Sequence, residues 1–216
     1  MEYTFHTYNQ LAADGMAMAL DKLLKDDLSC KLTPKRFARA TDSTQNKRFQ
    51  RLFDGDFDKM PVVVCIGSDL AVGDSLGPIV GSMLKYKTQG LHAYIYGTLA
   101  LPVTAKEIAY IRRFLKETHA DRQIIAVDAA VGAEGDIGLL RLNRAPLYPG
   151  AGAKKKLGAI GDISMLGIVA EKSVANFSLL NTTRLNLVYG MAEQISDALA
   201  SVLWQRQKAI GHRKNG

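Results

Sequence analysis

Short runs of apolar, largely β-branched residues alternate with segments of helical periodicity from residue 59 onward. Such runs, bounded by Gly, Pro or Asp, are typical of strands that are buried on both faces of a sheet. The predicted strands are residues 61–67, 92–96, 123–128, 138–142 and 162–169. Apolar spacing predicts helices at residues 76–86 and 183–204, and the capping pattern Thr-x-x-Glu at 104–107 predicts the start of a helix at 104–119. Because alternating strands and helices form βαβ units, the sequence predicts an α/β protein with a mostly parallel sheet.

The limits of this alternation define the predicted domains. Residues 59–205 form the α/β domain. Residues 1–58 contain one amphipathic helix, at 9–28, followed by a polar stretch, and are predicted to be an N-terminal helical and loop appendage. Residues 206–216 are rich in Lys and Arg and are predicted to be a basic tail.

The composition indicates a globular protein from a reducing compartment. A chain of 216 residues can bury a core without disulfides or a metal. Of its two cysteines, Cys30 and Cys65, the second lies within an apolar run and is predicted to be a core thiol. The sequence has no signal-peptide pattern and no apolar run of about 20 residues, so we expect a cytoplasmic protein without membrane contact.

The net charge of +7 allows two interpretations. Dispersed Lys and Arg residues keep a protein soluble, and they also attract an acidic or nucleic-acid-bound partner. Much of the excess lies in residues 31–51, 154–156 and 206–214.

A glycine-containing turn follows the first strand of the predicted domain and carries Asp74. Residues 67–78 read Gly-Ser-Asp-Leu-Ala-Val-Gly-Asp-Ser-Leu-Gly-Pro. Open α/β sheets bind ligands beyond the carboxyl ends of their strands, and glycine there lets the main chain approach a ligand. Ser68 and Asp69 share this turn and are candidates for substrate binding. The structural alternative is that Asp74 caps the next helix. Neither glycine-rich nucleotide-binding pattern is present.

A second carboxylate, Asp128, ends the predicted strand at 123–128. A carboxylate there is costly unless it is hydrogen-bonded, paired or used in chemistry. If the strands before Asp74 and Asp128 are neighbours, both carboxylates face one crevice and their pKa values are pushed apart. Such a pair can activate water for peptide hydrolysis without a metal. The alternative is that Asp128 caps the following turn.

Several motifs carry a family resemblance through their order and spacing. The strongest are Cys-Ile-Gly-Ser-Asp at 65–69, Gly-Asp-Ser-Leu-Gly-Pro at 73–78, Tyr-Gly-Thr-Leu at 96–99 and Ile-Ala-Val-Asp-Ala at 125–129. Others are Pro-Gly-Ala-Gly at 149–152 before Lys154 and Lys155, residues 161–164 and residues 167–169. Over about residues 60–200 the chain resembles the germination protease of spore-forming bacteria and, more closely, the smaller YyaC-like sporulation proteins.

The resemblance implies both a fold and an activity. The fold would be the three-layer α/β/α, phosphorylase/hydrolase-like arrangement of the hydrogenase-maturation (HybD-like) peptidases. The activity would be that of an atypical aspartic endopeptidase, with Asp74 and Asp128 as the catalytic pair and no cofactor. The basic loop with Gly152, Lys154 and Lys155 would bind substrate. The implied substrates are small acid-soluble spore proteins, which coat DNA in the spore or forespore.

Two other functions remain open from the sequence. One is a non-catalytic binding or regulatory protein of the spore, which holds an acidic or DNA-associated partner through the basic loop. The other is a metal-dependent peptidase like the hydrogenase-maturation relatives, which use two carboxylates and a histidine to hold nickel. No histidine lies between Asp128 and the tail, and His92 and His119 are predicted to be surface residues, so no metal is expected. The oligomeric state is also left open.

Overall fold

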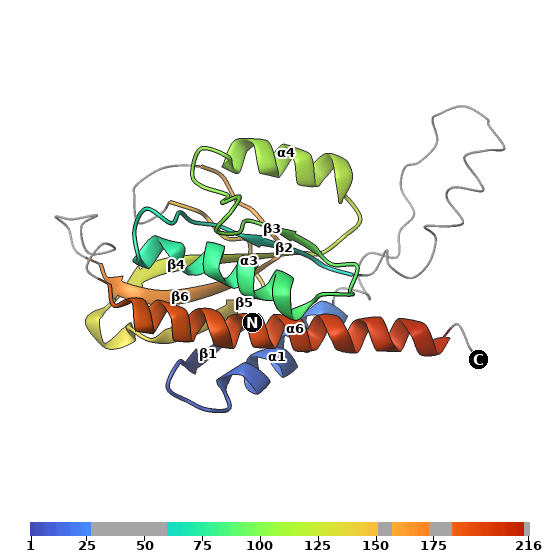
Figure 1. The fold of residues 1–216 in the computed structure, drawn as a ribbon, viewed down its shortest axis with the longest axis horizontal. Coiled ribbons are helices and arrows are strands. Elements are labelled where there is room, and N and C mark those ends of the chain that lie inside the picture. The colour runs from blue at the N-terminus through green and yellow to red at the C-terminus, as the bar shows by residue number, and fades with distance from the viewer. Residues whose placement is uncertain (27–59, 151–156, 173–182, 214–216) are drawn as a thin grey trace.

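The structure is a computed structural model that describes residues 1–26, 60–150, 157–172 and 183–213. Its centre is a six-stranded sheet in the order β1-β5-β6-β4-β2-β3 (Figure 1). The strands are β1 (Glu2–His6), β2 (Val62–Cys65), β3 (Tyr94–Tyr96), β4 (Ile124–Gly132), β5 (Leu139–Asn143) and β6 (Ile163–Glu171). β3, β2, β4 and β6 pair in parallel, whereas β5 is antiparallel to both β6 and β1. The predicted α/β class and mostly parallel sheet are therefore confirmed.

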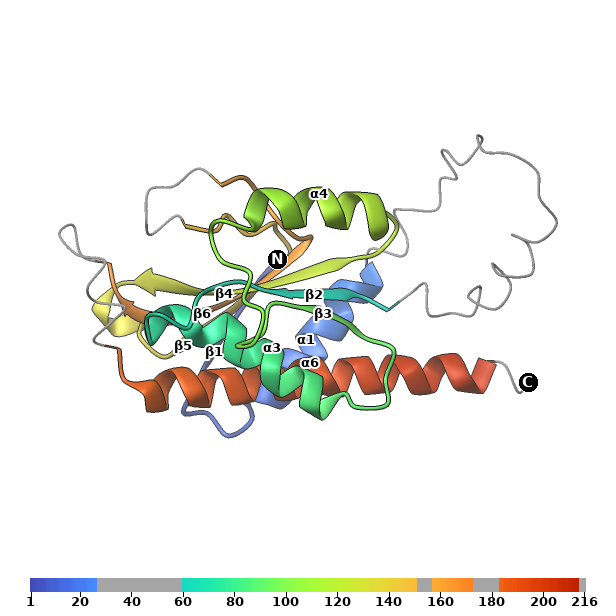
Figure 2. The same ribbon diagram turned by 45° about the horizontal axis from the view of Figure 1, so that its top comes forward.

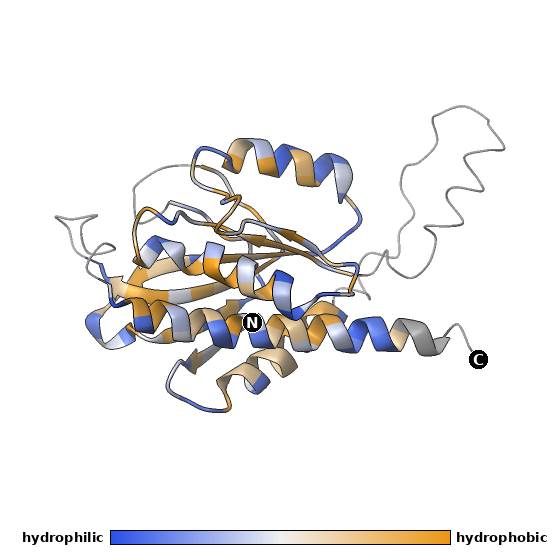
Figure 3. Ribbon diagram, in the orientation of Figure 1, coloured by the Kyte–Doolittle hydropathy of each residue, from blue (hydrophilic) through white to orange (hydrophobic). Residues whose placement is uncertain are grey.

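Helices cover both faces of the sheet, as Figures 1 and 2 show. On one face lies α4 (Ile108–Thr118), and on the other lie α1 (Ala12–Asp26), α3 (Leu76–Lys87) and α6 (Leu185–Arg213). Alternate residues of β2 serve the two sides: Val62 and Val64 pack in the cluster under α4, and Val63 and Cys65 pack in the other. Because both faces are covered, the central strands are apolar throughout, which Figure 3 shows in orange.

The predicted strands and helices are found in the structure. Most of their ends lie within a few residues of the predicted ends. The helix expected from residue 104 begins at Ile108, because residues 105–107 form a turn before it. The Thr104 main-chain N–H donates to the Glu107 carboxylate at 3.0 Å, which is one half of a capping box. Strand β4 is longer than predicted, because it continues past its predicted end at Asp128 as far as Gly132.

The N-terminal residues differ from the sequence-based expectation of an appendage. Strand β1 pairs antiparallel with β5 along its whole length, from Glu2 with Asn143 to His6 with Leu139. Helix α1 packs its apolar face, including Leu20, into the main core with α3 and α6. Residues 1–26 are thus an integral part of the sheet and its core, and residues 27–59 lie outside the described part of the chain.

The predicted basic tail also begins inside the fold. Helix α6 continues to Arg213, past the expected end at residue 204. Arg206 lies 3.9 Å from the carboxylate of Asp21 on α1, and its side chain is mostly buried. Residue 206 therefore joins two helices of the main core. Among the described residues, no helix combines the length and apolar character needed to span a bilayer.

Close approaches between main chains fix the start of α3 against the end of β2. A Cβ at Gly77 would lie 2.0 Å from the carbonyl oxygen of Ile66, and one at Gly97 would lie 1.8 Å from that of Cys65. Gly67 has φ +141°, and a Cβ there would lie 2.1 Å from the carbonyl oxygen of Asp74. Only glycine fits at these positions, so the glycines set the place of Asp74 relative to the sheet.

Candidate functional site

The two candidate aspartates lie where the strand order of the parallel sheet reverses. From β2 the chain passes through α3 to β3 on one side, and it then returns through α4 to β4 on the other side of β2. Ligands of open α/β sheets bind in the crevice beyond the strand ends at such a point. Asp74 lies in the 3₁₀ turn Gly73–Ser75 after β2, and Asp128 lies in β4, which pairs with β2 in parallel. The two strands are therefore neighbours, which is the condition under which the sequence predicts a shared crevice.

Asp128 is a buried carboxyl group with 8% of its surface exposed. One of its side-chain oxygens accepts a hydrogen bond from the Ala129 main-chain N–H at 2.8 Å. Burial raises the pKa of Asp128 well above its usual range, and the negative charge of nearby Asp74 raises it further. The Ala129 hydrogen bond acts in the opposite direction but is the weakest of these effects.

Asp74 is only partly buried, and it is the more acidic member of the pair. Burial raises its pKa, while a hydrogen bond from the Ser68 main-chain N–H to its carboxylate lowers it. The same N–H donates to the Asp74 carbonyl oxygen at 3.0 Å. As the pH rises, Asp74 therefore loses its proton first, and its charge helps Asp128 to keep the second proton. Burial and charge together thus raise the pKa of Asp128 more than that of Asp74.

The other predicted site residues fall into two groups. Ser68 and Asp69 lie in the turn that leads to Asp74, where the Ser68 hydroxyl accepts the Leu70 N–H at 3.2 Å and Asp69 is exposed. Gly152, Lys154 and Lys155 lie outside the described residues.

Sequence reasoning missed the loop that follows β3, which lies beside the Asp74 turn. The Val103 carbonyl oxygen accepts the Gly67 N–H at 3.0 Å, so the two loops meet at the end of β2. Each loop presents an exposed leucine: Leu70 is 91% exposed and Leu101 is 75% exposed. Large apolar residues within turns were the available signal, because such positions are usually polar.

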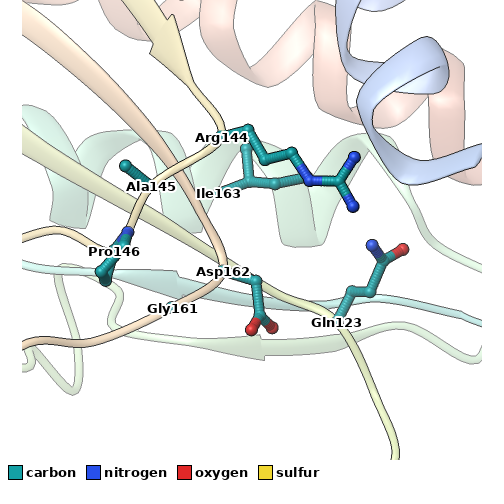
Figure 4. Close-up of a pocket in the computed structure, with 7 residues that line it drawn as sticks. All are labelled: Gln123, Arg144, Ala145, Pro146, Gly161, Asp162 and Ile163. Carbon is teal, nitrogen blue, oxygen red and sulfur yellow. The ribbon is translucent and has the colours of Figure 1, made fainter. Parts of the chain in front are cut away.

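A separate cavity lies at the opposite end of the parallel strands (Figure 4). It is an open pocket of about 330 Å³, and its lining includes Gln123, Arg144 and Asp162, which the close-up labels. The Asp162 carboxylate accepts the Ile124 N–H at 2.8 Å. Asp162 thereby holds the beginning of β4.

The histidine and cysteine positions bear on the alternative chemistries. His92 is exposed, as expected, but His119 is only 6% exposed, so its prediction as a surface residue is wrong. The Tyr96 hydroxyl lies 2.8 Å from Nε2 of His119, and this ring completes the packing at the end of α4. Cys65 is buried, which raises the pKa of its thiol. No group of three His, Cys, Asp or Glu side chains suited to a metal ion occurs in the part of the chain that the structure describes.

The buried carboxyl group predicts a stability effect that depends on pH. Because the folded state raises the pKa of Asp128, its contribution to stability is present below the usual aspartate pKa and is lost as the pH rises through the folded value. Asp128→Asn cannot ionise and keeps an oxygen for the Ala129 N–H. We therefore expect it to raise the melting temperature at pH 8 relative to wild type, with a smaller difference at pH 4. Thermal denaturation followed by circular dichroism measures both values.

Asp121→Asn is the matched control for this effect, because it removes the same charge at an exposed position before β4. Its melting temperature should follow that of the wild-type protein at both pH values. An Asp128→Asn variant that is less stable than wild type at pH 8 would contradict the assignment of a protonated, buried carboxyl group.

Comparison with known proteins gives the family of the chain. Residues 37–198 match the family described as "Protein of unknown function (DUF1256)". The chain is also similar to "Uncharacterized protein YyaC" of Bacillus subtilis (strain 168), with 36% identity over 170 residues, or 77% of this chain and 82% of that protein. Since the family match contains the strands and turns that carry Asp74 and Asp128, the site described above lies within the shared region. The protein is a YyaC-like member of the DUF1256 family.

Proposed function

We propose that the protein is a metal-independent aspartic peptidase in which Asp74 and Asp128 act together on a peptide bond. The observation that carries the proposal is the pair itself: two carboxyl groups at the strand-order reversal, with pKa values raised to different extents. One protonated and one ionised carboxyl group are what acid–base hydrolysis of an amide requires.

The proposed roles follow from the burial of each side chain. Ionised Asp74 takes a proton from a water molecule, and the oxygen of that water attacks the carbonyl carbon of the peptide bond. At the same time, protonated Asp128 gives its proton to the carbonyl oxygen. In the collapse of the tetrahedral intermediate, Asp74 gives its proton to the leaving amine and Asp128 regains one from the hydroxyl group. Both side chains then return to their starting states, so no outside acid or base is consumed.

The resemblance to the germination protease supports a substrate class and a place of action. On that basis we propose small acid-soluble spore proteins as substrates, in the cytoplasm of the spore or forespore, and a HybD-like three-layer fold. The basic residues 154–156 and the net charge of +7 favour attraction to substrates that are bound to DNA.

Incubation of the purified protein with small acid-soluble spore proteins, followed by mass spectrometry, tests the proposal. We expect defined fragments, and their formation should continue after treatment with a metal chelator. Intact substrate that stays bound, with an affinity that falls steeply with salt, would instead support the binding-protein alternative. Loss of cleavage with the chelator and its return with nickel would support the metal-dependent alternative.

A further inference from the structure

Strand β4 has an open edge that begins at the candidate catalytic residue. Its pairing with β2 ends at Val127, opposite Cys65, and the Val127 carbonyl oxygen then accepts the Ile66 N–H at 2.7 Å. Its pairing with β6 continues to Gly132, opposite Glu171. Figure 2 shows β4 and β6 running on beyond the end of β2. Within the described ranges, the part of β4 from Asp128 to Gly132 therefore has a strand partner on one side only.

The alternation of the strand determines which main-chain groups face this open side. The Val127 carbonyl points to β2, and the Gly132 carbonyl accepts the Lys172 N–H at 2.7 Å on the β6 side. The register between β4 and β6 shifts between Ala130 and Val131, but the Gly132 carbonyl still faces β6 after this shift. Along β4 itself the main-chain groups therefore keep alternating, and those of Ala129 and Val131 face away from β6. The Asp128 carboxylate accepts the Ala129 N–H, which ties the candidate acid to the same edge.

Three polar groups are left at this edge: the Ala129 carbonyl and both the N–H and carbonyl of Val131. None has a strand partner among the residues that the structure describes, and both residues are half-buried. An unpaired strand edge is a template for another extended chain. Half-buried main-chain polar groups next to a candidate catalytic pair are suited to hold a polypeptide by its backbone.

We propose that this edge binds the substrate as an added β-strand, which pairs with β4 and continues the line of β2. The scissile bond then lies next to Asp128. This inference rests on the proposed peptidase function and extends it by naming the substrate class: an unfolded polypeptide segment, recognised mainly through its main chain. A folded protein, whose backbone groups are already paired, does not offer such a strand.

The test uses the full-length Asp128→Asn variant, so that cleavage does not interfere with binding. The probe is fluorescently labelled ribonuclease A, either native or reduced and carbamidomethylated, so that one sequence is offered in folded and unfolded forms. We expect fluorescence anisotropy to detect binding of the unfolded form only. Equal binding of the two forms would overturn the proposal.

Two further substitutions at Val131 isolate the main-chain contact. Val131→Pro removes the N–H that faces the open edge and leaves the hydrogen bonds to β6 in place, whereas Val131→Ala shortens the side chain and keeps the N–H. We expect Val131→Pro to weaken binding about tenfold, as loss of a hydrogen bond with steric hindrance would do, and Val131→Ala to change it less than about twofold. Equal affinities of the two variants would also overturn the proposal.

Hydrogen–deuterium exchange keeps the test valid if Val131→Pro does not fold. In the Asp128→Asn protein, the Val131 amide should exchange more slowly when the unfolded probe is added, and unchanged exchange would refute strand addition. If the unfolded probe binds but the wild-type protein does not cleave it, the proposed peptidase function is refuted and strand addition stands. If Val131→Pro does not affect cleavage, strand addition is refuted and the proposed peptidase function stands.

Discussion

Replacement of either Asp74 or Asp128 by asparagine should lower the rate of peptide hydrolysis by about 10²–10⁴-fold, the range for loss of a general acid or base. An asparagine at position 74 cannot accept a proton from water, and an asparagine at position 128 cannot give one to the carbonyl oxygen. Both variants should fold, because asparagine has the size of aspartate and keeps a hydrogen-bonding oxygen. Quantitative mass spectrometry of the fragments gives kcat/KM, and circular dichroism confirms the fold.

The pH dependence distinguishes the two roles. In the wild-type protein, activity should fall at low pH as Asp74 is protonated and at high pH as Asp128 loses its proton. Because the pKa values of both carboxyl groups are raised, both pH limits of the activity should lie above the usual pKa of an aspartate. Residual activity of Asp128→Asn should lose the high-pH limit, since the amide that replaces the carboxyl group does not ionise. Asp121→Asn should retain the wild-type rate, and full activity in either candidate-site variant would refute the mechanism.

Gly77→Ala should destabilise the protein by about 3 kcal/mol, the upper end of the usual range for overpacking. In a helix such a substitution normally stabilises by about 0.5–1 kcal/mol, because alanine has less backbone entropy to lose than glycine. Here the new Cβ would meet the Ile66 carbonyl oxygen at 2.0 Å, and a main-chain atom cannot move aside as a flexible side chain can. The loss corresponds to a fall in melting temperature of roughly 6–12 °C, measurable by calorimetry.

Gly190→Ala provides the comparison, because Gly190 also lies within a helix, α6, and its nearest neighbour is the Thr7 hydroxyl at 3.9 Å. That variant should be as stable as the wild-type protein or more stable. If Gly77→Ala were equally harmless, α3 would not be held against the end of β2 by close contact. Since Asp74 lies within one helical turn of Gly77, the same shift should also reduce activity.

The central part of the fold could be predicted from the sequence because it depends on local signals. Unbroken apolar runs mark β2 and β4, since strands covered on both faces need no polar side. The capping pattern at Thr104 marked the start of α4 to within one turn. The closeness of Asp74 and Asp128 followed from a general rule, that parallel strands end at one edge of the sheet, together with the assumption that their two strands were neighbours.

The remaining features depend on contacts between distant parts of the chain, which no local pattern reveals. Strand β1 has only five residues and lies at an edge of the sheet, and its partner strand β5 is far from it in the sequence. Arg206 was assigned to a tail by charge alone, because its distance to Asp21 depends on the packing of two helices. His119 has a polar side chain next to the end of a helix, and its burial depends on contacts with Tyr96, Tyr94 and Phe114.

The pairing of β1 with β5 affects how the chain can assemble as it leaves the ribosome. Synthesis proceeds from the N-terminus, so β1 is available well before β5 emerges. When residues 139–143 appear, the outer edge of β5 can be covered at once by a strand of the same molecule. A nascent chain built in this order gives neighbouring polypeptides little opportunity to pair with β5.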